Sequence, residues 1–404
     1  MSSTTEPPRD IFDAGTRGLQ HHGLRRANER AVLTVVGFNP GVSNADIARL
    51  SGLAPQTVSA ILADIDRAGM ITRGEVLRGR RGQPATPIYL RADGAFSIGV
   101  EIGWRHVSVV RLNMHAEVVG QQRRAYDYPD ARTLIDDIGE MTYALVAEME
   151  PEDRVRLVDM GVSMPSNLPG NLQLVQAPEE QRSLWQEIDI AAELAQRTGL
   201  EISLFNDGNA ACWAELIAFP RPRPATFVYF LISHHIAAGI VSEGSLWEGP
   251  TGNSANLGSM LVMDSAGRLQ AAHFVASITS LINRLAEAGI TATPDTLEDW
   301  DWSSFGSVLD QWIEDCAVVL ARVVFNTTAV IESGLVVIDS IIPDAITGRL
   351  IDRLSFALSQ LPVASYQQPE VVAGHLGVLA PAIGAAELPL YRRYFSRALV
   401  DIAS

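Results

Sequence analysis

LEISLFNDGNAACWAELI, residues 200–217, predicts a strand that runs directly into a helix. The first half of the segment alternates apolar and polar side chains, as a half-buried strand does. The second half, 208–217, predicts a helix. Asn206 and Asp207 stand at the junction, where side chains that cap a helix N-terminus belong. The segment is therefore one strand–helix unit of an α/β body.

The rest of the body shows one pattern of elements twice. The first copy has predicted strands at 96–103, 106–114, 117–126 and 156–165 and helices at 131–149 and 188–198. The second copy has predicted strands at 226–233, 236–244, 245–250, 334–339 and 369–374 and helices at 270–289, 305–332 and 344–360. Two strand-rich meanders, each followed by strand–helix units, predict a duplicated α/β body with a ligand cleft between its halves. We expect the first half to cover 95–200 together with a C-terminal helix at 387–404, and the second half to cover 201–386.

Residues 21–91 predict a separate head that begins with three helices. Apolar residues of 25–38 recur on one helical face, and an Asn-Pro-Gly sequence ends this helix. Ser43 then stands where an N-cap belongs, before a short second helix. Pro55 suits the first turn of a third helix, which Gly69 closes. A helix, a short helix, a turn and a longer helix are the order of a helix-turn-helix domain.

A basic, glycine-rich segment follows the third helix. RGEVLRGRRGQPATP, residues 73–87, lies between strand-like runs at 70–72 and 88–90 and is predicted to be the wing of a winged helix. Glycine lets backbone approach a DNA duplex, guanidinium groups suit the minor groove, and polar residues of the third helix suit the major groove. The alternative is a solvated loop beside ordinary polar surface residues. The candidate DNA contacts are Pro55, Gln56, Thr57, Ser59, Arg78, Arg80, Arg81, Gly82 and Gln83.

The charges of the chain are distributed unevenly between the head and the body. The net charge is −16, yet residues 1–91 hold 12 Arg and 8 acidic residues, whereas residues 92–404 hold 19 Arg and 39 acidic residues. There is no lysine, so every fixed positive charge is an arginine. A basic head on an acidic body indicates that only the head meets nucleic acid.

Composition excludes several other classes of protein. Hydrophobic residues make up 47% of the chain, enough to bury substantial cores. No apolar run reaches the roughly 18 residues that span a bilayer, and the N-terminus lacks the apolar stretch of a secretory signal. Two cysteines cannot form a disulfide framework or a four-thiolate zinc site. We expect a cytoplasmic protein without a membrane partner, with residues 1–20 as a disordered tail.

The motif Asn206-Asp207-x-Asn209-Ala210-Ala211-x-x-Ala214-Glu215, preceded by the predicted winged helix, resembles the ROK family (repressors, open reading frames, kinases). The segment GIVSEGSLWEGPTG at 239–252 supports this resemblance, which covers about residues 25–390. It implies an actin-like, hexokinase-like body of the ribonuclease H-like class. The family contains sugar kinases without a DNA-binding head and sugar-responsive regulators with one.

In a kinase of this family, the resemblance implies that Asp207 is the general base and that Asn206 binds the sugar. The phosphate loops depart from the family pattern. Trp104 replaces a glycine in the first loop, residues 233–237 lack the glycines of the second, and residues 336–343 lack consecutive glycines on the adenosine side. Without glycine the backbone cannot approach phosphates closely. We therefore expect a vestigial base, no ATP or other cofactor and no enzyme activity. The alternative is a bifunctional sugar kinase that uses Asp207.

The sugar-binding positions are altered and the zinc cluster of the family is missing. Asn256, Ser259 and Gln270 stand where the resemblance implies a glutamate, a zinc-ligand histidine and a second glutamate. Residues 252–270 contain no cysteine, so we expect no metal. Amides and a hydroxyl still hydrogen-bond sugar hydroxyls, so the candidate ligand residues are Asn206, Asp207, Asn256, Ser259 and Gln270. Trp185 and Trp247 either stack on a sugar ring or belong to the core.

Together these observations predict a DNA-binding transcriptional regulator, a repressor of carbohydrate metabolism genes in a bacterium. Its partners would be operator DNA and a sugar-like effector. One winged helix contacts few bases, so we expect a homodimer or homotetramer. A third interpretation is a body that has lost ligand binding and serves only for dimerisation or for docking a partner protein.

Overall fold

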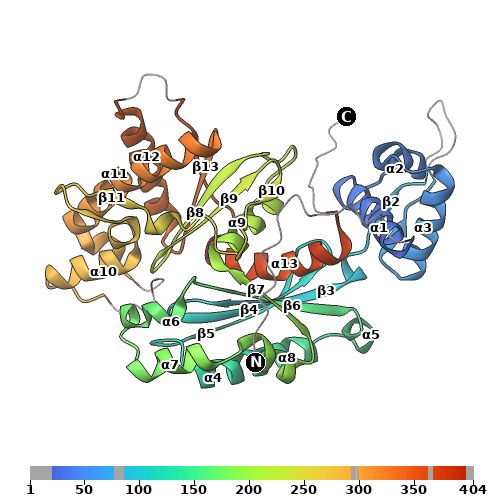
Figure 1. Cartoon of the computed structure of the whole chain (residues 1–404), viewed down its shortest axis with the longest axis horizontal. Coiled ribbons are helices and arrows are strands. Elements are labelled where there is room, and N and C mark those ends of the chain that lie inside the picture. Colours follow the sequence, from blue (N-terminus) through green and yellow to red (C-terminus); the bar gives the residue numbers. More distant parts are fainter. Residues whose placement is uncertain (1–20, 77–85, 293–296, 298–299, 363–366, 397–404) are drawn as a thin grey trace, which may run out of the picture.

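The computed structural model describes residues 21–76, 86–292, 297, 300–362 and 367–396. Figure 1 shows a small head beside a larger body with two halves. The predicted tail at 1–20 lies outside the described residues, as do the candidate DNA contacts Arg78, Arg80, Arg81, Gly82 and Gln83.

The described residues of the head form three helices and a two-stranded antiparallel sheet, at the places that the sequence predicts. Its elements are α1 (His21–Phe38), α2 (Asn44–Ser51), α3 (Pro55–Arg67), β1 (Ile71–Arg73) and β2 (Ile88–Leu90). The Ser43 side chain accepts a hydrogen bond from the backbone N–H of Asp46 and so caps α2. Gly52 follows α2 with a φ of 69°, a left-handed conformation that glycine adopts without strain. The apolar faces of the three helices form one core, which includes Leu390 of the body.

The first half of the body contains a five-stranded sheet in the order β5-β4-β3-β6-β7. Strands β3, β4 and β5 form the predicted antiparallel meander, and β6 and β7 run parallel to β3. The elements are β3 (Phe96–Ile102), β4 (His106–Asn113), β5 (Val118–Ala125), α4 (Ala131–Ala147), α5 (Pro151–Arg154), β6 (Leu157–Met164), α6 (Leu168–Asn171), α7 (Glu179–Glu187), α8 (Ile190–Thr198) and β7 (Glu201–Asn206). The boundary predicted at residue 200 is therefore one strand too early. Strand β7 is an edge strand of the first sheet.

The second half repeats this topology in the order β10-β9-β8-β13-β14, with the first three strands antiparallel and the last two parallel to β8. The elements are α9 (Asp207–Ala218), β8 (Phe227–Ile232), β9 (Ile236–Ser242), β10 (Ser245–Leu246), β11 (Leu261–Met263), β12 (Leu269–Ala271), α10 (Ile278–Glu287), α11 (Gly306–Ile331), β13 (Leu335–Ser340), α12 (Asp344–Ser359) and β14 (Glu370–Ala373). The duplicated α/β body is thus confirmed. The helix predicted at 270–289 is wrong in its first third, because Ser277 caps a helix that begins only at Ile278.

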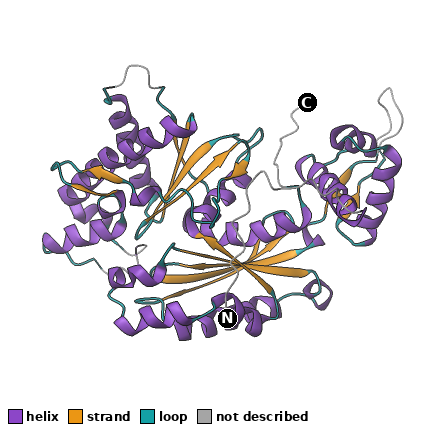
Figure 2. Cartoon of the chain, viewed as in Figure 1, coloured by secondary structure: helices purple, strands orange, loops and turns teal. Residues whose placement is uncertain are grey.

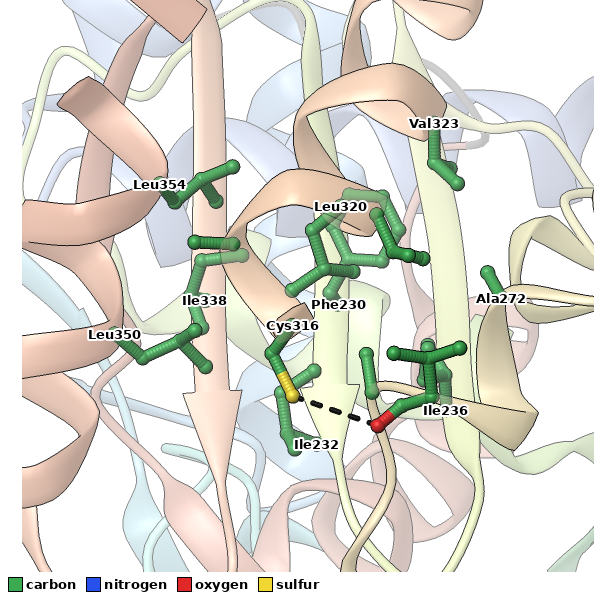
Figure 3. Packing of buried hydrophobic residues seen from close by; sticks show 14 of the residues in the cluster. Phe230, Ile232, Ile236, Ala272, Cys316, Leu320, Val323, Ile338, Leu350 and Leu354 are labelled. Carbon is green, nitrogen blue, oxygen red and sulfur yellow. Dashed lines mark hydrogen bonds between the residues drawn. The ribbon is translucent and has the colours of Figure 1, made fainter. Parts of the chain in front are cut away.

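The core of the second half lies between its sheet and the helices α11 and α12 (Figure 3). Phe230 and Ile338 of the sheet pack with Leu320 of α11 and Leu350 of α12, and all four are fully buried. Burying a side chain of this size stabilises the fold by about 1.5–3 kcal/mol. The core therefore holds α11 and α12 firmly on this sheet. None of the described helices is long and apolar enough to cross a membrane.

Helix α13 (Ala380–Tyr394) covers the face of the first sheet opposite α4 and α8, and it also contacts α9 (Figures 1 and 2). It begins well before the predicted start at residue 387. The sequence does not reveal the true start, because residues 380–391 are all buried and therefore show no apolar stripe. In addition, Pro389 inside the helix suggests a break. Glycines allow α13 to approach both neighbours closely. On the sheet side, a Cβ on Gly161 would lie 1.8 Å from the Ala385 carbonyl oxygen, and a Cβ on Gly99 would lie 2.0 Å from the Ala382 carbonyl oxygen. On the side of α9, a Cβ on Gly384 would lie 1.8 Å from the Ala210 carbonyl oxygen.

Candidate functional site

A cleft of about 230 Å³ lies between the two halves of the body. It is lined by residues that follow the ends of β3, β6 and β7, by the start of β9, and by the turns at 255–259 and 273. The lining includes four of the five predicted ligand residues, Asn206, Asp207, Asn256 and Ser259. The sequence pattern therefore located side chains that meet in one cavity, although they are about fifty residues apart.

Asn206 and Asp207 line the cleft and also stand at the start of α9, which the Asn206 side chain caps. The Asn206 side chain caps α9 by accepting a hydrogen bond of 3.0 Å from the backbone N–H of Asn209. Its amide nitrogen donates to the Ser166 hydroxyl at 2.9 Å and to Asp207 Oδ1 at 3.0 Å. Ser166, in turn, donates to Asn253 Oδ1 of the second half at 2.9 Å. A continuous polar network thus joins both halves across the cleft.

The environment of Asp207 makes its negative charge unfavourable. Its pKa is raised to about 6, mainly by burial, and the negative charge of Glu101 contributes in the same direction. The backbone N–H of Gly208, which donates to Oδ1 at 2.8 Å, acts in the opposite direction. A carboxyl group with this pKa is close to half-protonated near pH 6. It can therefore accept or donate a proton at physiological pH, as a general base requires.

Asn256 and Ser259 lie on an exposed turn at the mouth of the cleft. The Ser259 hydroxyl donates to Asn256 Oδ1 at 3.0 Å, which fixes the orientation of the two side chains. Both side chains are exposed, so each can bind a polar ligand without leaving a buried partner unsatisfied.

Gln270, the fifth predicted ligand residue, does not line the cleft. It lies on β12, and its amide nitrogen donates to Asp264 Oδ2 at 2.7 Å. It lines a different cavity, which it shares with Arg284 and Asp315. The short hairpin of β11 and β12 places the Gln270 side chain beside Asp264. His273, three residues later, lines the cleft instead.

Aromatic rings occupy the positions that correspond to the first two phosphate loops of a ROK kinase. The ring of Trp104, which follows β3, lies 4.8 Å from the ring of His235, which precedes β9, at an angle of 66°. The ring of His273 lies 5.4 Å from that of His235, at an angle of 87°. Burial lowers the pKa of His235 to about 4, so this imidazole is neutral at physiological pH. The two loops thus meet through aromatic side chains rather than through backbone N–H groups. Glu101 of the first loop faces the buried His106, with 3.3 Å between Oε2 and Nε2.

The tryptophans considered for sugar stacking lie outside the cleft. Trp185 is buried in the core of the first half, where its indole N–H donates to the Pro129 carbonyl oxygen at 2.8 Å. Trp247 is 48% exposed, and it does not line the cleft. Sequence reasoning missed His235 and His273 as lining residues, because only the three-dimensional arrangement brings them beside Asp207. Among the described residues, no group of three or more His, Cys, Asp or Glu side chains could hold a metal ion.

The first turn of α3 presents the described DNA candidates at the surface of the head. Pro55, Gln56 and Ser59 are exposed and Thr57 is half-buried. The Ser59 hydroxyl donates to the Pro55 carbonyl oxygen at 2.9 Å and accepts from the Asn44 amide at 3.1 Å. The opposite face of the helix, with Val58, Ile61, Leu62 and Ile65, is buried in the head.

Comparisons with known proteins cover most of the chain. The profile of the ROK family matches residues 97–391. The xylose repressor of Bacillus subtilis is 22% identical over 242 residues, an alignment of 59% of this chain and 61% of the repressor, so the match spans about three fifths of that protein. A solved ROK family transcriptional regulator, a homologue of the E. coli Mlc protein, superposes with a TM-score of 0.67 at 18% identity over 92% of this chain and 98% of its own. A ROK family glucokinase from Streptomyces griseus, in complex with glucose and AMPPNP, has a TM-score of 0.56 at 16% identity over 73% of this chain and 99% of its own. The fold likeness to the regulator thus extends over more of this chain than the likeness to the glucokinase.

Proposed function

The chain belongs to the ROK family, and from this premise we propose that it is a transcriptional repressor whose head binds operator DNA and whose cleft binds a sugar or sugar derivative. The observation that carries this proposal is the head. The helix α3 buries its apolar face and exposes its polar first turn beside a two-stranded sheet. This is the geometry with which a recognition helix enters the major groove. We propose that the protein acts as a homodimer or homotetramer on paired half-sites, because symmetric heads match a symmetric operator.

The wing is tested by replacing Arg80 and Arg81 together with alanine. Each arginine that neutralises a DNA phosphate adds about 0.9 to the slope of log affinity against log salt, so we expect the double variant to lose about 2 from this slope for each bound head, or about 4 for a dimer. The measurement is fluorescence anisotropy at several salt concentrations, on a duplex selected by the wild-type protein from a random pool. The control is the double variant Arg349→Ala with Arg353→Ala on α12. It changes the net charge by the same amount, at a place far from the head. Equal slopes for the two double variants would contradict the wing.

The cleft supports a sensor because polar side chains from both halves meet there while aromatic rings occupy the phosphate region. A ligand that contacts both halves favours the closed arrangement, and such a preference is the basis of allosteric control. We expect a sugar, sugar acid or sugar phosphate to raise the melting temperature without ATP. A ligand at about 100 times its dissociation constant adds roughly 2.7 kcal/mol to the free energy of unfolding.

Two amide variants distinguish the cleft from the rest of the surface. Asn256→Ala removes a side chain at the mouth of the cleft, and we expect it to weaken the binding of the effector about two- to tenfold, as the loss of one hydrogen bond does. Gln270→Ala removes a similar amide outside the cleft and should leave the affinity unchanged. Isothermal titration calorimetry with the sugar found in the melting screen measures both. An equal loss in the two variants would place the ligand elsewhere.

A sugar kinase is the second candidate, and the position of Asp207 favours it. The carboxyl group lies in the cleft with a pKa raised to about 6, which suits a general base. A melting shift that requires ATP and magnesium, followed by sugar phosphorylation that Asp207→Asn abolishes, would establish this function instead of the sensor.

A further inference from the structure

The cleft that contains Asp207 offers no fixed positive charge to an anionic ligand. None of the described residues that line it is an arginine, and the chain contains no lysine. Arg105 follows the lining residue Trp104 in the sequence, but it donates to the Asp127 carbonyl oxygen at 2.9 Å and does not line the cleft. Proteins bind phosphates and carboxylates chiefly through guanidinium and ammonium groups. The described walls of the cleft lack this means of recognition.

The N-terminus of α9 points its first backbone donors at side chains of the protein itself. A helix N-terminus attracts anions because its first N–H groups have no partner within the helix. Here the N–H of Gly208 donates to Asp207 Oδ1 at 2.8 Å, and the N–H of Asn209 donates to Asn206 Oδ1 at 3.0 Å. These two donors are therefore not free for the phosphate or carboxylate of a ligand.

The fixed charge in the cleft is negative. Asp207 lines the cleft, and its pKa, raised mainly by burial to about 6, leaves it ionised at pH 8. The negative charge of Glu101 contributes to this rise. Burial lowers the pKa of His235 to about 4 and also lowers the pKa of His273, so both rings are neutral at pH 8. An anionic ligand would be repelled in surroundings where water screens charge only weakly.

The groups that the cleft does offer suit the hydroxyl groups and the ring of a sugar. Side-chain amides and hydroxyls both donate and accept hydrogen bonds, as sugar hydroxyls do. Those that line the cleft are Ser166, Asn167, Asn171, Asn206, Asn256 and Ser259. The rings of Trp104, His235 and His273 also line it and can pack against the C–H groups of a sugar. The volume of about 230 Å³ is small for a ligand pocket and suits one sugar ring.

We propose that the cleft binds an uncharged monosaccharide and discriminates against acidic and phosphorylated sugars. This inference rests on the proposed sensor function, which it narrows from sugars and their derivatives to one class. In this arrangement Asp207 accepts a hydrogen bond from a hydroxyl group of the neutral sugar and repels an anionic one. Specificity is a difference of affinities, and an unpaired like charge is one of the ways to create it.

The test is isothermal titration calorimetry of the full chain at pH 8 with three pairs of sugars. The pairs are glucose with glucuronate, galactose with galacturonate, and N-acetylglucosamine with its 6-phosphate. The members of each pair differ in one charged group. We expect at least one neutral sugar to bind, and its charged partner to bind at least about tenfold more weakly.

Two variants test whether charge causes this discrimination. Asp207→Asn removes the negative charge and keeps the shape, so the ratio of the two affinities should fall at least about fivefold. Ser259→Arg adds a positive charge on the exposed turn at the mouth of the cleft and should lower the ratio as well. The matched control is Asp93→Asn, which removes a carboxylate that does not line the cleft and should leave the ratio unchanged.

The outcomes separate this inference from the sensor function on which it rests. A charged sugar that binds as tightly as its neutral partner would overturn the inference and leave the sensor standing. The same holds for a ratio that neither Asp207→Asn nor Ser259→Arg changes while both variants melt as folded proteins. The absence of binding by all six sugars at millimolar concentration would overturn the sensor function together with the inference.

Discussion

Gly384→Ala is expected to lower the free energy of unfolding by at least about 3 kcal/mol, or to prevent folding altogether. The added Cβ would lie 1.8 Å from the carbonyl oxygen of Ala210 in α9. Both groups belong to the backbone of packed helices, so neither can move aside as a flexible side chain does. The substitution would separate α13 from α9. Urea unfolding followed by circular dichroism measures the change.

Gly348→Ala on α12 is the matched control for this substitution. Gly348 lies inside a helix, and a Cβ there would meet nothing within 4 Å. Alanine is the better helix former by about 0.5–1 kcal/mol, so this variant should be slightly more stable than the wild type. A Gly384→Ala variant within about 1 kcal/mol of the wild type would show that the contact between α13 and α9 is loose.

Asp207→Asn is expected to stabilise the protein at pH 8 and to lose this advantage below about pH 4. In the folded chain the pKa of Asp207 is raised to about 6, mainly by burial. The folded state therefore binds this proton more tightly than the unfolded state, whose pKa is about 4. The free energy of unfolding falls as the pH rises between these values, by about 3 kcal/mol for two pKa units. Asparagine carries no charge and avoids this loss.

The measurement is the stability difference between variant and wild type at pH 8 and at pH 4, because effects independent of pH cancel. Asp93→Asn provides a control of opposite sign. A hydrogen bond from Arg91 lowers the pKa of Asp93 to about 2, so this variant should lose stability relative to the wild type above about pH 4. A difference for Asp207→Asn that is the same at both pH values would contradict the raised pKa.

The parts of the fold that the sequence predicted are those that local pattern determines. The strands of the two meanders are short runs bounded by turn residues, and Ser43 and Asn206 cap helices that follow them directly. The local pattern also placed Asn206 and Asp207 where a strand ends and a helix begins, whereas their role as site residues came from the resemblance to the ROK family.

The parts that failed depend on contacts between distant segments. The start of α13 was missed because the helix is buried on all sides and shows no periodicity. Gln270 was misplaced because the hairpin of β11 and β12 turns it toward Asp264, away from the cleft. Trp104, His235 and His273 come from segments far apart in the chain, and no spacing reveals that they line one cleft.

The place of α13 in the chain has a consequence for synthesis on the ribosome. Strands β3 and β6 emerge early, yet the helix that covers them is translated only after the whole second half. Until then the nascent chain carries one uncovered apolar face of its first sheet, the kind of surface that chaperones bind. The head likewise packs against Leu390 only when α13 is present. Folding of this protein therefore finishes from its C-terminal side, because a late helix completes units that were made first.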